Sequence, residues 1–115
     1  MTEMEKLREQ MREFARVRDW DQFHSPKNLA MALSVEVAEL VENFQWLTEE
    51  QSRRLDAKSQ AAVRTEIADV LLYLIRLADQ LGIDPVAAAQ RKLVENGRKY
   101  PVEKSRGNRK KYTEL

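Results

Sequence analysis

The chain reads SQAAVRTEIADVLLYLIRLADQL from Ser59 to Leu81. This stretch contains no Gly or Pro and is followed directly by Gly82, so we expect one long helix that ends at a glycine cap. Within it, the run Val70–Ile75 is apolar on nearly every side of a helix. A helix that is apolar all round needs neighbours all round. The stretch therefore predicts a helical bundle whose core is completed by a partner subunit.

The flanking sequence carries further helix signals on both sides. Ser25-Pro26 and Asp84-Pro85 each place a capping residue before a proline, which is the pattern of a helix start. No segment alternates apolar and polar residues as a half-buried strand would. We therefore expect an all-α bundle of about four to five helices. These helices are expected at about residues 3–18, 26–46, 48–57, 59–81 and 85–100.

Four carboxylates occupy positions at or beside the apolar faces of two expected helices. Glu36 falls inside the apolar arc of the second helix, and Glu39 follows one turn later on the same side. Glu66 and Asp69 repeat this spacing on the long helix. Because a buried unpaired ion costs several kcal/mol, four converging acids need a positive partner. Salt bridges with Lys or Arg are one solution, and a hard cation such as Mg²⁺ or Mn²⁺ held by this all-oxygen set is the other.

Seven short segments together form a recognisable pattern. In chain order they are RDWDQFH (18–24), EVAEL (36–40), FQW (44–46), EIADVLLYL (66–74), NGRKYPV (96–102), SRG (105–107) and KYT (111–113). With these segments the chain resembles the MazG-like all-α nucleoside triphosphate pyrophosphohydrolases, and among them it is most similar to the dCTP pyrophosphatases. The resemblance covers about residues 14–115.

The resemblance implies Mg²⁺-dependent hydrolysis of dCTP or its modified forms to the monophosphate and pyrophosphate, by a protomer that forms a homodimer or homotetramer. Mn²⁺ is a possible substitute for Mg²⁺. The implied metal ligands and catalytic carboxylates are Glu36, Glu39, Glu66 and Asp69. The implied substrate contacts are Trp20, His24, Trp46, Tyr73 and Asn96 for base and sugar, and Lys92 and Lys99 for the phosphates. Among the carboxylates we expect Glu36 to orient or deprotonate the attacking water, because its helix arc is the most apolar.

Composition excludes several other classes of function. Lys and Arg number 20 against 19 Asp and Glu, and no helix carries a concentrated basic face, so binding to a nucleic acid polymer is not expected. The run Val70–Ile75 is far shorter than the roughly 20 residues that cross a membrane. The absence of Cys is compatible with the cytoplasm, where we expect the protein. We expect an all-α catalytic domain over residues 1–101 and a basic tail over 102–115, either mobile or held by a partner.

Two alternatives to dCTP hydrolysis stay open from the sequence. The first is the same reaction on dUTP or on a broad range of nucleotides, because contacts to the edge of the base cannot be placed without coordinates. The second is a non-catalytic helical dimerisation or regulatory module, against which the intact acidic quartet argues. For Trp20 and Trp46, a role as core anchors competes with stacking on a nucleobase.

Overall fold

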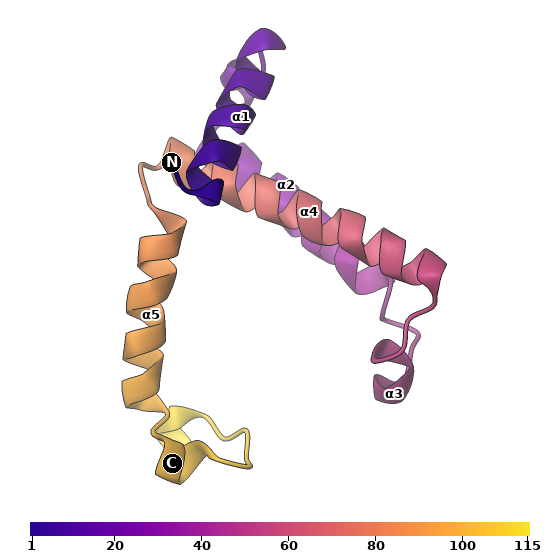
Figure 1. Cartoon of the computed structure of the whole chain (residues 1–115), viewed down its shortest axis with the longest axis vertical. Coiled ribbons are helices and arrows are strands. Elements are labelled where there is room, and N and C mark those ends of the chain that lie inside the picture. Colours follow the sequence, from indigo (N-terminus) through magenta and orange to yellow (C-terminus); the bar gives the residue numbers. More distant parts are fainter. The chain divides into compact units, whose positions relative to one another are not determined.

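A computed structural model describes all 115 residues and contains helices and no strand, which confirms the all-α prediction (Figure 1). The chain divides into two compact units, residues 1–83 and 84–115. The predicted boundary after residue 101 stays a prediction. The elements are α1 (Glu3–Val17), the 3₁₀ turn η1 (Asp21–Phe23), α2 (Pro26–Glu42), α3 (Glu49–Ser52), α4 (Ala57–Gln80), α5 (Pro85–Lys99), α6 (Val102–Ser105) and the 3₁₀ turn η2 (Tyr112–Glu114). No helix has both the length and the apolar character needed to span a membrane.

The helix ends follow local hydrogen bonds. As predicted, α2 begins at Pro26, and the Ser25 hydroxyl accepts from the Asn28 amide at 3.1 Å. It ends at Glu42 and not near Trp46, because the Asn43 side chain donates to the carbonyl oxygens of the last turn. The short helix α3 likewise ends earlier than expected, at Ser52. The long helix starts two residues before the predicted position, because Asp56 is its cap.

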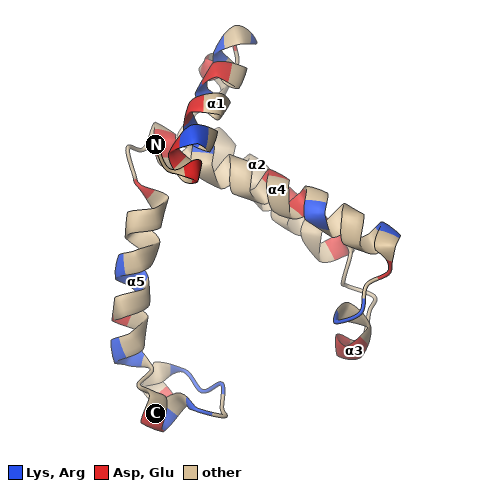
Figure 2. Ribbon diagram, in the orientation of Figure 1, with Lys and Arg blue, Asp and Glu red and all other residues tan.

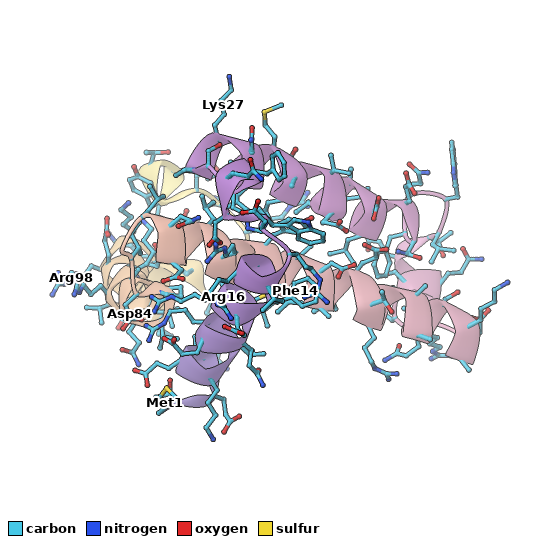
Figure 3. The ribbon with its side chains drawn as sticks, turned by 90° about the horizontal axis from the view of Figure 1, so that it is seen from above. Met1, Phe14, Arg16, Lys27, Asp84 and Arg98 are labelled. Atoms are coloured by element: carbon cyan, nitrogen blue, oxygen red, sulfur yellow. The ribbon has the colours of Figure 1, made fainter.

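In the first unit, α2 and α4 form a hairpin against which α1 packs (Figures 1 and 3). The two helices run antiparallel, since the segment that contains α3 joins the end of α2 to the start of α4. The interior is small. It consists of the apolar residues Ala15, Leu29, Val63, Ile75 and Ala78 together with one buried charge, Arg76.

Large apolar side chains remain exposed along both helices of the hairpin. They include Met31, Val35, Val37 and Val41 on α2 and Ile67, Leu71 and Leu74 on α4. An isolated protomer therefore leaves much of the apolar surface of the hairpin in water. Each Å² of this surface that became buried would contribute roughly 25 cal/mol of stabilisation.

The second unit consists of α5 and a C-terminal segment that folds back on it. The rings of Tyr100 and Tyr112 meet edge to face with centroids 6.0 Å apart, and Lys99 Nζ lies 4.9 Å from the centre of the Tyr112 ring. Residues 102–115 thus have short helical turns and aromatic contacts within their own unit. Basic residues follow one another along the loop after α6 (Figure 2). Residues 84–115 carry nine Lys and Arg against four Asp and Glu, whereas residues 1–83 carry eleven against fifteen.

Candidate active site

Three carboxylates converge between α2 and α4, as the helix spacing predicts. Glu36 and Glu39 lie one turn apart on α2, and Glu66 comes from the facing side of α4. One carboxylate oxygen from each lies within 4.8 Å of the others. We call Glu36, Glu39 and Glu66 the carboxylate cluster. The antiparallel hairpin produces it, because the middle of α2 lies beside the middle of α4.

The carboxylate cluster has no positive partner in the chain. None of the ion pairs in the structure includes any of its members. The Oε2 atoms of Glu36 and Glu66 are shielded from solvent and make no hydrogen bond. Such atoms are costly in a fold unless something satisfies them. The alternative of interhelical salt bridges is therefore not what the structure shows.

Burial and mutual repulsion change the protonation of this cluster. Burial raises the pKa of Glu36 to about 7, and the hydrogen bond to Glu39 and its negative charge act in the same direction. The pKa of Glu66 is also raised, first by burial and then by the charge of Glu39. Carboxyl groups of raised pKa at one place are typical of sites that bind cations or move protons.

Asp69 lies beside the carboxylate cluster. It is not one of the three acids whose oxygens meet, but its charge contributes to the raised pKa of both Glu36 and Glu66. It also lines a cavity of about 250 Å³. The cavity is lined by Met11, Phe14, Ala15, Trp20, His24, Asp69, Leu72 and Tyr73. Asp69 thus connects the acids to this cavity.

The cavity brings together four of the residues predicted from the sequence: Trp20, His24, Asp69 and Tyr73. The Trp20 ring meets the Phe14 ring edge to face at 5.7 Å and the His24 ring at 6.2 Å. Aromatic faces with a few polar groups among them suit a flat, partly polar ligand.

The remaining predicted contacts do not line this cavity. Trp46 lies in the turn after α2 and is 87% exposed, so it is not a core anchor of the protomer. Lys92 and Lys99 pair with Glu95 along α5, at 3.6 and 3.4 Å, and Asn96 lies on the same helix in the second unit. The substrate roles of these four residues stay predictions.

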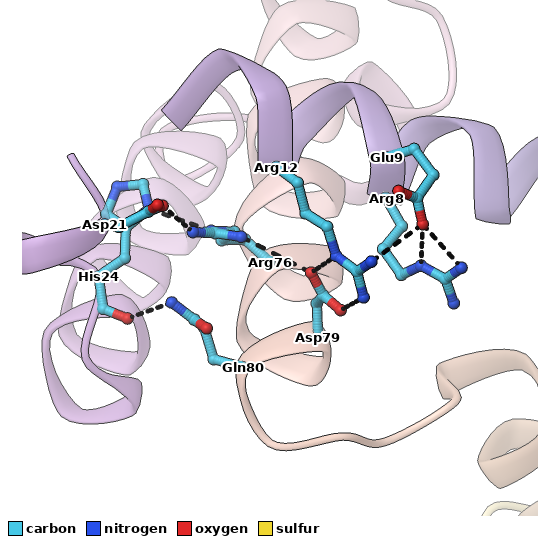
Figure 4. Close-up of polar contacts among 8 residues, drawn as sticks. All are labelled: Arg8, Glu9, Arg12, Asp21, His24, Arg76, Asp79 and Gln80. Carbon is cyan, nitrogen blue, oxygen red and sulfur yellow. Dashed lines mark hydrogen bonds and ion pairs between the residues drawn. The ribbon is translucent and has the colours of Figure 1, made fainter. Parts of the chain in front are cut away.

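Sequence reasoning missed a second polar group, near the C-terminal end of α4 (Figure 4). Arg76 on α4 is only 4% exposed and pairs with Asp21 of η1 at 2.6 Å and with Asp79 at 3.6 Å. Arg12 of α1 donates to both Asp79 oxygens, at 2.7 and 2.5 Å. We call Arg12, Asp21, His24, Arg76 and Asp79 the arginine network. No spacing rule reveals it, because its members come from α1, from η1 and the residue that follows it, and from α4.

Known proteins share both the sequence and the fold. The model of the MazG-like family matches residues 31–115. The dCTP pyrophosphatase 1 of Mus musculus is 45% identical over 114 residues, which cover 97% of this chain and 67% of that protein. The human dCTP pyrophosphatase 1 is 42% identical over 114 residues, with 97% of this chain and 67% of that protein covered.

Solved structures agree with the sequence matches. The crystal structure of a pyrophosphatase from Archaeoglobus fulgidus superposes on the chain with a TM-score of 0.82 at 44% identity. The superposition covers 88% of this chain and 94% of that one. By the length of the family match and by the identity to these relatives, the chain belongs to the MazG-like family.

Proposed function

We propose that this protein is a Mg²⁺-dependent pyrophosphohydrolase that converts dCTP, and modified forms of it, to the monophosphate and pyrophosphate. The observation that carries the proposal is the carboxylate cluster, which has two buried oxygens without partners. The aromatic cavity reached through Asp69 offers a place for a base. The kinship with dCTP pyrophosphatases supports the choice of substrate.

Glu36, Glu39, Glu66 and Asp69 would hold the cation. Their donors are all oxygen, which suits Mg²⁺ and allows Mn²⁺ as a substitute. The fit is supported by the orphaned oxygens, because an unpaired buried carboxylate gains most from a bound cation. When bound, the cation would neutralise charge on the triphosphate during phosphoryl transfer.

The chain's own residues would do the rest. Glu36 would orient the attacking water and accept its proton, since its Oε2 is buried and unpaired. Attack of that water on phosphorus breaks the anhydride bond between the α- and β-phosphates and releases pyrophosphate. Trp20 would stack on the base and Tyr73 would offer its hydroxyl, since both line the cavity. Trp46 and Asn96 would supply further contacts to the base and sugar. The cations Lys92 and Lys99 would meet the phosphates.

We also propose that the enzyme is a cytoplasmic homodimer or homotetramer. The exposed apolar residues of α2 and α4, such as Val41 and Ile67, support association through the hairpin. Sedimentation equilibrium would decide the oligomeric state. A monomer at micromolar concentration would refute the assembly and leave the proposed chemistry standing.

The experiment for the activity measures pyrophosphate release from each deoxyribo- and ribonucleoside triphosphate, with Mg²⁺ and with EDTA. Metal-dependent release that is strongest for dCTP supports the proposal in full. Release that is strongest for dUTP, or that is equal for all bases, keeps the reaction and corrects the substrate. No release from any nucleotide contradicts the enzyme and favours a binding module.

A further inference from the structure

The His24 ring is held by a buried arginine. Arg76 donates from Nε to His24 Nδ1 at 3.1 Å, and Gln80 donates from its side chain to the His24 carbonyl oxygen at 2.9 Å (Figure 4). Arginine carries only donors and stays protonated in proteins. The ring nitrogen that faces Arg76 must therefore be the unprotonated acceptor. In the neutral ring, this leaves the proton on Nε2.

Arg76 itself has little freedom to turn away. Its guanidinium pairs with Asp21 and Asp79, and Asp79 is fixed in turn by Arg12. Rotation of the buried Arg76 side chain would break its pairs with both Asp21 and Asp79 and leave its own buried charge without a partner. Burial, and then the charge of Arg76, lower the pKa of His24, while Asp21 opposes this in part. His24 is thus neutral and held by its neighbours in one orientation.

We infer that Arg76 is a positioning residue for the cavity: it fixes His24 in the Nε2–H tautomer, so that the ring presents a hydrogen-bond donor to the ligand. His24 lines the cavity with Trp20 and Tyr73, and with Nδ1 engaged, Nε2 is the ring nitrogen left for a ligand. This inference rests on the proposed function for the identity of the ligand.

A fixed donor beside a stacking surface selects a planar ligand with an acceptor atom on its edge. Cytosine and uracil both present an acceptor at O2, but N3 is an acceptor in cytosine and carries a proton in uracil. A donor that meets N3 therefore favours cytosine. A neutral imidazole that was free to exchange tautomers could instead present an acceptor and so tolerate either base. The tautomer would thereby contribute to selectivity as well as to affinity.

His24 is the only histidine, so its tautomer can be read without assignment. The experiment records long-range ¹H–¹⁵N spectra of uniformly labelled protein at neutral pH, without nucleotide. We expect one neutral ring with its proton on Nε2. A proton on Nδ1, an even mixture of tautomers, or a doubly protonated ring would overturn the inference.

Two substitutions at Arg76 separate positioning from packing. R76K keeps a donor-only side chain and should retain the Nε2–H tautomer, whereas R76Q can donate or accept and should give a mixture. R8Q is the matched control, because Arg8 pairs only with Glu9 on α1. For the proposed dCTP reaction, R76Q should raise KM about tenfold with little change in kcat, and R8Q should change neither.

The spectra and the activity assay together separate failure of the inference from failure of the proposed function. If R76K and R76Q give the same tautomer as the wild type and only lower Tm, Arg76 is merely structural and the inference fails. If the wild type hydrolyses no nucleotide, the proposed function fails, and the spectra still decide the tautomer. Should R76Q not fold, the wild-type and R76K spectra suffice to contradict the inference.

Discussion

The carboxylate cluster and the arginine network, which both involve α4, differ in how their charges are balanced. In the arginine network, charges alternate and every buried charged group has a partner, from Arg12 through Asp79 and Arg76 to Asp21. In the carboxylate cluster, all the charges are negative and two buried oxygens have no partner. The network is complete within the chain, and the cluster is incomplete without a cation. The unsatisfied oxygens of the cluster thus mark the place where a cation is expected, whereas the ion pairs of the network hold the scaffold around His24.

The sharpest test of this contrast is Glu36→Gln. Removal of this carboxylate should lower kcat/KM for dCTP by about a thousandfold, because both a ligand of the cation and the proposed proton acceptor are lost. The same change should raise the stability of the metal-free protein by about 1 kcal/mol, since it removes the cost of burying the charge and then the repulsion from Glu39. Pyrophosphate assays and urea denaturation measure the two effects. Full activity in the folded variant would show that the cluster is not the active site.

In the arginine network, loss of a carboxylate should lower the stability of the protein instead of raising it. Asp79→Ala removes the carboxylate shared by Arg12 and buried Arg76, so the protein should lose about 3 kcal/mol of stability. Urea denaturation measures the loss, and Arg16→Ala, which breaks an exposed pair with Glu13, is the control that should cost little. A loss no larger than that of the control would show that the network does not hold the scaffold.

The two groups should also respond oppositely to pH. The folded pKa of Glu36 lies near 7, above its ordinary value of 4.5, so ionisation of this group opposes folding. The metal-free protein should therefore gain about 1 kcal/mol as the pH falls from about 7 to 5, and Glu36→Gln should remove this gain. The pKa of Asp79 is held below its ordinary value by Arg12, so its contribution is lost only under stronger acid. Denaturation between pH 4 and 8 would contradict this if stability instead fell steadily below pH 7.

The smallest effect on stability is expected at Trp46. Its ring is almost fully exposed, so Trp46→Ala should change the free energy of unfolding by less than about 0.5 kcal/mol. If the ring stacks on a nucleotide, the same change should weaken dCTP binding by about 1 kcal/mol or more. Calorimetric titration beside thermal melting measures both. A large fall in Tm with unchanged binding would make Trp46 a structural contact, for instance between subunits.

Helix spacing predicted that four carboxylates would come together, and three of them, Glu36, Glu39 and Glu66, do so. Residues three apart share one side of a helix, so two such pairs can meet where two packed helices lie at the same level. The start of α2 was equally predictable, since Ser25 and Pro26 act within one turn. The end of α2 was not predictable. It depends on a hydrogen bond from the Asn43 side chain to a carbonyl oxygen of the last turn, and a polar residue at that position need not form one. The arginine network was not predictable either, since Arg76 and Asp21 are 55 positions apart in the sequence and meet only in the folded chain.

The position of the carboxylate cluster has a further consequence for folding. Its members lie on two helices joined by residues 43–56, so a cation bound by all of them would hold α2 and α4 together across that loop. A cation bound only when the two helices lie together stabilises the closed hairpin and resists separation of the helices. By mass action, the closed population of the hairpin would then follow the free concentration of the cation. The supply of divalent metal would set the lifetime of the folded enzyme as well as its rate of turnover.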